Sequence, residues 1–218
     1  SDVCSSDLAG THGGGVSKVR DGKVTSIRVG DTQNSNTLGH IMEDRDGVIW
    51  CAASPGLYRI KNDSASFFPV GKDTGWIGLI HQTKDGSILF VSNSMLYSYS
   101  PADASLKRLR FGTDDDTFTC VFEDDEGTLW FGTLEGSVVK VSGGRIVERL
   151  ALRFGALHSV ASDQDGNLWF ASASGAIKVS RQNFPRGEVI RFSIENGLPG
   201  NDIIVCYVDR EDNLWVGS

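Results

Sequence analysis

The chain has 218 residues, 39% hydrophobic and 9% aromatic, which supports a packed core and excludes a disordered chain. Its 21 basic and 28 acidic side chains give a net charge of -7 without a basic stripe, so nucleic acid is not an expected partner. The balance of 26 glycines to 5 prolines favours many tight turns, as in an all-β protein. No apolar run approaches the roughly 18 residues that cross a bilayer, and the N-terminus has no signal-peptide pattern.

The first eight residues, SDVCSSDL, are what one frame of a common short-read sequencing adapter encodes. We therefore interpret residues 1–8 as an assembly artefact and leave them out of the fold prediction. The chain is then expected to be the truncated end of a larger protein, with residues 9–218 as its folded part. Long-read sequencing of the locus tests this interpretation, which a longer natural frame containing the same codons would contradict.

A motif recurs along the chain with a period near 40 residues. Aligned on one aromatic position, its five copies fall at Trp50, Leu89, Trp130, Trp169 and Trp215. The separations are 39, 41, 39 and 46 residues. A period of this size indicates a repeat architecture, in which each copy forms one structural unit.

Each period contains four short apolar runs. In the first complete copy they cover residues 39–43, 48–53, 57–60 and 66–70, with turn signals between them. Helical spacing is absent over any window of useful length. Residues 15–29 read as the last two strands of an earlier copy, and the final copy stops after its second strand. Four strands in about 40 residues predict the blade of a β-propeller.

We therefore predict an all-β fold for residues 9–218, a β-propeller of four-stranded antiparallel blades. About five blade equivalents are present, which we interpret as an arc cut from a larger ring. The blades are expected around residues 11–30, 37–70, 76–111, 117–150, 156–193 and 202–218. The tryptophans of the aromatic position are predicted to pack in the wedge between blades, because a large flat side chain buries much area there: Trp50, Trp130, Trp169 and Trp215.

The segment EDDEGTLWFGT (residues 123–133) raises the question of a calcium site, because four acids precede a glycine. Its counterparts do not keep these acids: Lys84 stands where Asp125 stands, and Asp212 replaces the glycine. A hairpin turn needs only one side-chain acceptor, so we predict a turn and no metal. The acceptor is expected at the residue before the glycine, in the five copies Asp46, Asp85, Glu126, Asp165 and Glu211. The four cysteines show no CxxC spacing, so no zinc or redox cofactor is expected either.

The segments EDRDGVIW with GLYRI, EDDEGTLWFGT, DQDGNLWFASASGAIKV, and FSIENGLPGNDI followed by VDREDNLWVGS resemble the two-component regulator propeller repeats. The resemblance spans residues 11–218, with one mild departure at Gly200, where many such repeats carry serine. It implies a ligand-sensing, extracytoplasmic segment of a membrane-bound two-component or related signalling protein, located in the periplasm. It also implies a small-molecule or oligosaccharide ligand, a membrane-anchored and dimeric parent protein, and no enzymatic step or cofactor within this chain.

Three other functions stay open. DQDGNLWF also resembles the repeat of streptogramin-lyase-like propeller enzymes, and His40 and His158, 10 and 11 residues before their tryptophans, would point towards one mouth of the channel. A sialidase-like propeller has a related turn motif, but its acid and glycine are spaced differently. The same fold also serves as a protein-interaction scaffold.

A ligand is expected on the face where the loops between successive blades gather with the turns between second and third strands. Trp76 is the leading candidate because it lies outside the packing position, and an aromatic beside polar groups can stack on a sugar. The other candidates are polar side chains of the same loops: Asp114, Asp116, Arg153, Asn201 and Asp202.

Overall fold

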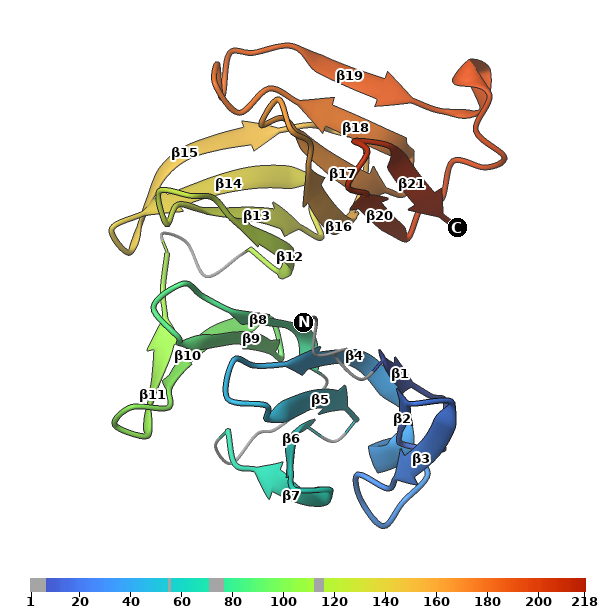
Figure 1. Ribbon diagram of the computed structural model, residues 1–218. Coiled ribbons are helices and arrows are strands. Elements are labelled where there is room, and N and C mark those ends of the chain that lie inside the picture. The colour runs from blue at the N-terminus through green and yellow to red at the C-terminus, as the bar shows by residue number, and fades with distance from the viewer. Residues whose placement is uncertain (1–6, 55, 71–76, 112–115) are drawn as a thin grey trace. The chain divides into compact units, whose positions relative to one another are not determined.

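Antiparallel strands account for nearly all the regular structure of this protein (Figure 1). The computed structural model describes residues 7–54, 56–70, 77–111 and 116–218. Two 3-10 turns are the exceptions, η1 (Asn34–Asn36) and η2 (Ile194–Asn196). Across these ranges no helix has the length and apolar character needed to span a membrane. The chain divides into two units, Ser1–Leu109 and Arg110–Ser218, and each is described by itself.

The described residues of unit 1 form three sheets, each built from strands that are consecutive in the chain. The first sheet contains β1 (Asp7–Gly10), β2 (Val16–Arg20) and β3 (Lys23–Ile27). The second contains β4 (Leu38–Glu43), β5 (Ile49–Ala53), β6 (Gly56–Lys61) and β7 (Ser64–Phe68). The third contains β8 (Ile77–Gln82), β9 (Ile88–Ser92), β10 (Met95–Ser100) and β11 (Ser105–Leu109).

Unit 2 also contains three sheets of consecutive strands. The first contains β12 (Phe118–Glu123), β13 (Leu129–Thr133), β14 (Ser137–Ser142) and β15 (Arg145–Ala151). The second contains β16 (Leu157–Ser162), β17 (Leu168–Ser172), β18 (Gly175–Val179) and β19 (Val189–Phe192). The third contains β20 (Val205–Val208) and β21 (Leu214–Gly217). The prediction of an all-β fold with four-stranded antiparallel units is therefore confirmed.

The core of each unit lies between neighbouring sheets. In unit 1, Trp50 of β5 packs edge-on against Phe68 and lies close to Tyr99 of the next sheet. In unit 2, Trp130 packs edge-on against Phe184, which follows β18 of the next sheet. These two tryptophans are 2% and 1% exposed, whereas Trp215 of the two-stranded sheet is 63% exposed. An aromatic position is thus buried where a following sheet covers it.

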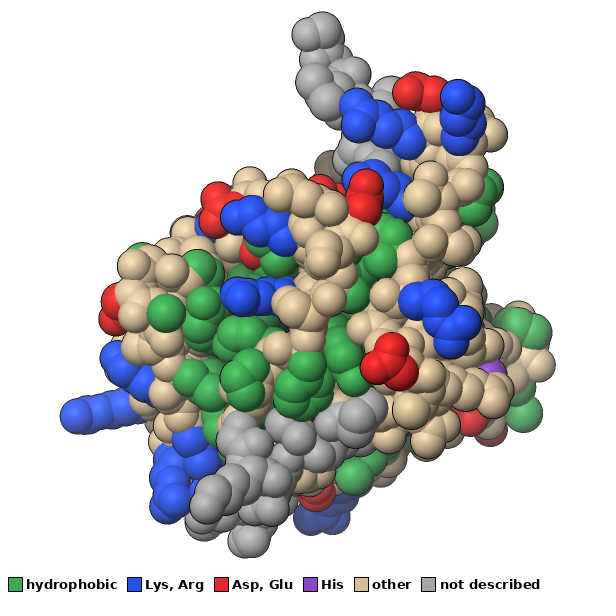
Figure 2. All heavy atoms as spheres, turned by 90° about the horizontal axis from the view of Figure 1, so that it is seen from below, with side chains coloured by type: hydrophobic (Ala, Val, Ile, Leu, Met, Phe, Trp, Pro, Cys, Tyr) green, Lys and Arg blue, Asp and Glu red, His purple; other side chains and the backbone are tan. Residues whose placement is uncertain are grey.

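The outermost strand of a sheet meets solvent. Val24 of β3 is 66% exposed and Phe67 of β7 is 44% exposed. Figure 2 views the molecule from the side on which Figure 1 draws these strands, and shows hydrophobic side chains gathered at the centre of the face with Lys and Arg side chains around them. Second strands such as β5 and β9 are instead buried along their whole length.

The first sheet has one strand more than the sequence pattern predicts. Residues 15–29 were expected to be the last two strands of a blade, and the structure adds β1 in front of them. Leu8 of β1 pairs with Lys18, as Trp130 pairs with Lys140 in unit 2. Leu8 therefore occupies the aromatic position of a sixth copy. The similarity of GTHGGGVSKV (10–19) to GTLEGSVVKV (132–141) is the sequence signal that identifies this copy.

Candidate functional site

The turn between first and second strands is closed by an aspartate six residues before the aromatic position. In the stretch EDDEGTLW, Asp124 Oδ1 accepts hydrogen bonds from the backbone N–H groups of Glu126 (3.0 Å) and Thr128 (2.9 Å). Its other oxygen, Oδ2, accepts one from Trp130 Nε1 at 2.9 Å. The same carboxylate–indole bond recurs in three more copies: Asp44–Trp50 at 2.8 Å, Asp163–Trp169 at 2.9 Å and Asp209–Trp215 at 2.7 Å.

This arrangement corrects the predicted turn acceptor. The acid before the glycine was expected to accept the turn hydrogen bonds, and in these four copies the acceptor lies two residues earlier. Only in the Leu89 copy does the predicted residue act, because Asp85 Oδ1 accepts from Ser87 N at 3.0 Å. That copy has Thr83 in place of the aspartate. The acceptor moves because Thr83 has no carboxylate, and its hydroxyl instead donates a hydrogen bond to Asp85 Oδ1.

In each copy that has both a tryptophan and a third strand, a basic side chain lies across from the tryptophan. Arg59, Lys140 and Lys178 lie directly across from Trp50, Trp130 and Trp169, and Ser98 lies across from Leu89. The Nζ atoms of Lys140 and Lys178 lie 5.1 and 5.2 Å from their indole centroids, within cation–π range. In these four copies a cation lies across from each tryptophan and a serine lies across from the leucine, whereas the copy at Leu8 keeps a cation, Lys18, without a tryptophan.

The carboxylates of Asp124 and Asp209 are held in the ionised form. Burial opposes the ionisation of Asp124, but hydrogen bonds from Trp130 and the turn N–H groups, with the nearby Arg181, outweigh it and lower its pKa. The exposed Asp209 has its pKa lowered to about 2, first by the bond from Trp215. No group of three His, Cys, Asp or Glu residues that could hold a metal is found in the described part of the chain. The conspicuous acids thus build turns.

Two of the predicted ligand residues, Trp76 and Asp114, lie outside the described residues. Asp116 is described, and its carboxylate forms a bidentate ion pair with Arg149 of β15, with one N–O distance of 2.6 Å. Asp116 and the nearby Glu135 both raise the pKa of this arginine, Asp116 first. Asp116 therefore ties the entry of β12 to the outer strand of its own sheet, a connection that sequence spacing did not predict.

The loop face of unit 2 carries the remaining candidates. Asn201 Oδ1 accepts a hydrogen bond from Ile194 N at 3.0 Å, which fixes the loop that leads into β20. The side chain of Asp202 is 74% exposed, and its Oδ1 lies 3.9 Å from His158 Nε2 at the start of β16. Arg153 is exposed between β15 and β16, with a backbone φ of 60°. The structure thus brings Asp202 and His158 together, while Asn201 is used within its own loop.

His40, the other histidine considered at a channel mouth, connects two first strands. Its Nδ1 accepts a hydrogen bond from Ile80 N of β8 at 3.0 Å. Ser159 occupies the same position, ten residues before a tryptophan, and its Oγ lies 3.4 Å from Cys206 N of β20. Burial, and then the neighbouring His81, lower the pKa of His40, so the imidazole is neutral near pH 7 and can accept this bond. His40 therefore has a structural contact that serine can replace.

Comparison with solved structures defines the class of fold first. The extracellular domain assigned to the hybrid two component system BT3049 from B. thetaiotaomicron superposes with a TM-score of 0.79 at 19% identity, over 99% of this chain and 30% of that one. The extracellular domain assigned to the one component system BT4673 from the same organism gives 0.79 at 22% identity, over 97% and 30%. A streptogramin B lyase gives 0.76 at 14% identity, over 94% and 69%. The chain has a β-propeller fold and spans 30% of the length of the two extracellular domains.

The sequence then specifies the type of blade. The model of the two component regulator propeller family matches residues 112–135 and 197–218. These segments contain the copies of the motif at Trp130 and Trp215, so the resemblance to this family is confirmed. No curated protein matches the chain at a significant level.

Proposed function

We propose that this chain is a ligand-sensing segment of the extracytoplasmic propeller of a membrane-bound two-component or related signalling protein. The observation that carries the proposal is the match of the regulator propeller model to two copies of the repeat. The similarity to two extracellular sensor domains supports it. The parent protein is then anchored in the inner membrane and dimeric, this segment lies in the periplasm, and the output kinase or cyclase domain lies outside this chain.

The proposed ligand is a small molecule or oligosaccharide bound at the loop face. Asp202 and Arg153 are exposed there, and an exposed carboxylate and guanidinium can hydrogen-bond sugar hydroxyls. Asn201 orders the loop that presents Asp202. Trp76 and Asp114 stay in the proposed set on sequence grounds. Asp116 contributes indirectly, because Arg149 already occupies its carboxylate.

Calorimetric titration of the chain with a panel of oligosaccharides tests this proposal. We expect at least one to bind, and Asp202→Asn to weaken that binding about tenfold because a charge-assisted hydrogen bond is lost. Asp165→Asn is the matched control, since Asp165 is an exposed acid in the turn between the first and second strands of the same sheet as His158. Absence of binding across the panel, or an equal effect of both variants, would count against the proposal.

A lyase activity is the second candidate, favoured by the superposition with streptogramin B lyase over 94% of this chain. His158 near Asp202 supplies an imidazole beside an exposed carboxylate, the kind of group that acts as a general base. Incubation with a streptogramin B compound and mass spectrometry decides between the two. A ring-opened product that disappears in His158→Ala would favour the enzyme, and an unchanged substrate would favour the sensor.

A further inference from the structure

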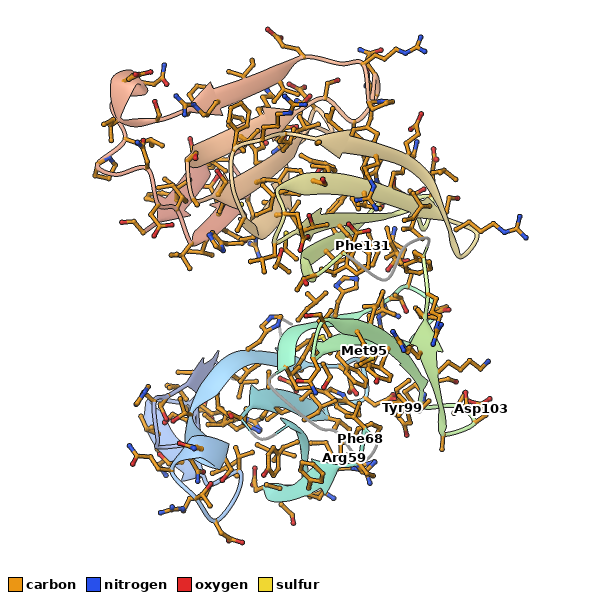
Figure 3. The ribbon with its side chains drawn as sticks, turned by 180° about the vertical axis from the view of Figure 1, so that it is seen from behind. Arg59, Phe68, Met95, Tyr99, Asp103 and Phe131 are labelled. Atoms are coloured by element: carbon orange, nitrogen blue, oxygen red, sulfur yellow. The ribbon has the colours of Figure 1, made fainter. Side chains whose placement is uncertain are left out.

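A polar groove lies between the sheets β4–β7 and β8–β11 of unit 1, away from the loop face. Its volume is about 700 Å³, and we call it the charged groove. Asp44, Asp46, Arg59 and Lys61 line it, together with Trp50 and Tyr99. Figure 3 shows Arg59 and Tyr99 near each other, with Phe68 between their strands. The size is within the range of small-molecule sites, which span roughly 300–1,000 Å³.

Unit 2 contains the counterpart of this groove, between the sheets β12–β15 and β16–β19, with a volume of about 480 Å³. Two side chains that form ion pairs there have no charged equivalent in unit 1. Leu168 and Ile88 each come directly before the aromatic position, and their cross-strand partners are Val179 and Tyr99. Arg181 lies two residues after Val179, and Pro101 lies two residues after Tyr99. Arg181 and Pro101 are therefore equivalent. By the same reasoning Glu148, opposite Lys140, is equivalent to Ser66, opposite Arg59.

The two substitutions remove both ion pairs that neutralise the counterpart. In unit 2, Arg181 Nη1 lies 3.6 Å from Asp124 Oδ2 and its guanidinium lies over the ring of Phe122. Lys140 Nζ lies 3.4 Å from Glu148 Oε2. In unit 1, Pro101 offers no cation to Asp44, and Ser66 offers no carboxylate to Arg59. The Nε atom of Arg59 instead donates a hydrogen bond of 3.4 Å to Ser66 Oγ.

Both signs of charge are consequently left open in one groove. Asp44 accepts hydrogen bonds from Trp50 and two backbone N–H groups, but no cation lies within ion-pair distance of it in the described part of unit 1. The same holds for Asp46, Arg59 and Lys61 among these described residues. A groove lined by two carboxylates and two cations without internal pairing is complementary to a molecule that carries both charges.

We propose that the charged groove binds a small zwitterion with an ammonium and a carboxylate group, the chemistry of a free amino acid or a dipeptide. The ammonium takes the place that the Arg181 guanidinium has in the counterpart, beside the carboxylates of Asp44 and Asp46. The ligand carboxylate takes the place of Glu148, beside Arg59 and Lys61. Trp50 and Tyr99 form the apolar floor between the two ends. The charged groove is separate from the loop face. The proposal for the groove does not depend on the function proposed for the loop face.

Titration with glycylglycine, followed by calorimetry on the 218-residue chain, tests the proposal. Glycylglycine carries both charges, N-acetyl-glycylglycine lacks the ammonium, and glycylglycine amide lacks the carboxylate. We expect glycylglycine to bind at millimolar concentration or better, and each blocked form to bind about tenfold more weakly. If glycylglycine does not bind to the unsubstituted chain, or if all three compounds bind equally, the proposal is overturned.

Two substitutions copied from unit 2 give a second test. Pro101→Arg supplies the missing cation to Asp44 and Ser66→Glu supplies the missing carboxylate to Arg59, so each should weaken glycylglycine binding about tenfold. Thr25→Arg and Thr25→Glu on the exposed strand β3 add the same charges elsewhere in unit 1 and should leave binding unchanged. Circular dichroism checks that each variant is folded. Folded Pro101→Arg and Ser66→Glu variants that bind like the unsubstituted chain would contradict the assignment of the groove.

Discussion

At the residue scale, the aspartate six positions before each tryptophan is the most informative side chain of the repeat. One carboxylate satisfies the indole N–H and the turn N–H groups at once, as Asp124 does for Trp130. Both residues are buried, and a buried donor without a partner costs about 1–3 kcal/mol. Asp124 of EDDEGTLWFGT is therefore explained by the turn that it closes and by the tryptophan that it binds.

Replacing this aspartate by its neutral isostere should destabilise unit 2. Asp124→Asn turns one acceptor towards the indole N–H into an amide donor and removes the charge beside Arg181, so we expect a loss of about 2 kcal/mol in the free energy of unfolding. Glu126→Gln, at the position predicted from sequence to be the acceptor, should change stability by less than about 0.5 kcal/mol. Urea unfolding of both variants measures the difference, and equal losses would contradict this account.

His40 should make stability depend on pH. Its pKa in the folded chain lies below the unfolded value of about 6.5, so the unfolded chain binds more protons and stability falls as pH drops below that value. His40→Gln keeps an acceptor for Ile80 N but does not titrate. The variant should therefore show a smaller loss of stability than the unsubstituted chain between about pH 7 and 5. Chemical unfolding at each pH tests this, and parallel curves for the two proteins would rule out His40 as the titrating group.

The sequence carried a signal for the turn acceptor that the prediction placed two residues too late. The aspartate to tryptophan spacing is visible in four copies, and its absence beside Leu89 marks it as a pair. Asp116 could not be recognised as structural, because its partner Arg149 lies 33 residues away on another strand. Pairing across a sheet depends on register, which the spacing of residues does not specify.

At the scale of elements, alternating apolar residues and glycine turns predicted four strands per copy. The exact partners depend on local geometry: the first strands of the complete sheets each carry a register shift, as between Leu38 and His40. β1 was missed because residues 1–8 were left out of the fold prediction and because DLAG has no tryptophan at the aromatic position. Its pairing with β2 is still the pairing of the repeat, through Leu8 and Lys18.

The turn between β17 and β18 should be intolerant of a side chain. Gly175 has a backbone φ of 125°, and a Cβ there would lie 2.0 Å from Phe192 O. Gly175→Ala should therefore cost about 2 kcal/mol or more, since backbone or sheet must shift. Gly143 also has a positive φ, of 57°, but a Cβ there meets nothing within 4 Å, so Gly143→Ala should cost about 1 kcal/mol. Thermal unfolding of both variants compares them, and a smaller loss for Gly175→Ala would contradict the predicted clash.

At the scale of the whole molecule, each unit buries one tryptophan, Trp50 or Trp130, between the sheets of successive copies, and the fold agrees with those of two extracellular domains. The repeat period alone led to the fold class. The period could not locate a ligand site, because the charged groove depends on missing ion-pair partners. Pro101 and Ser66 stand where the counterpart has Arg181 and Glu148. Such places are the positions at which equivalent grooves of one chain differ, and the equivalence of two grooves follows from the registers of their sheets.

The complete reading frame of the parent gene tests the central proposal most directly. If this chain is part of a signalling sensor, the frame should encode further propeller blades, a membrane-spanning helix and a kinase or cyclase domain. A frame that ends after one closed propeller, with no membrane-spanning helix and no output domain, would contradict the proposal and favour the lyase.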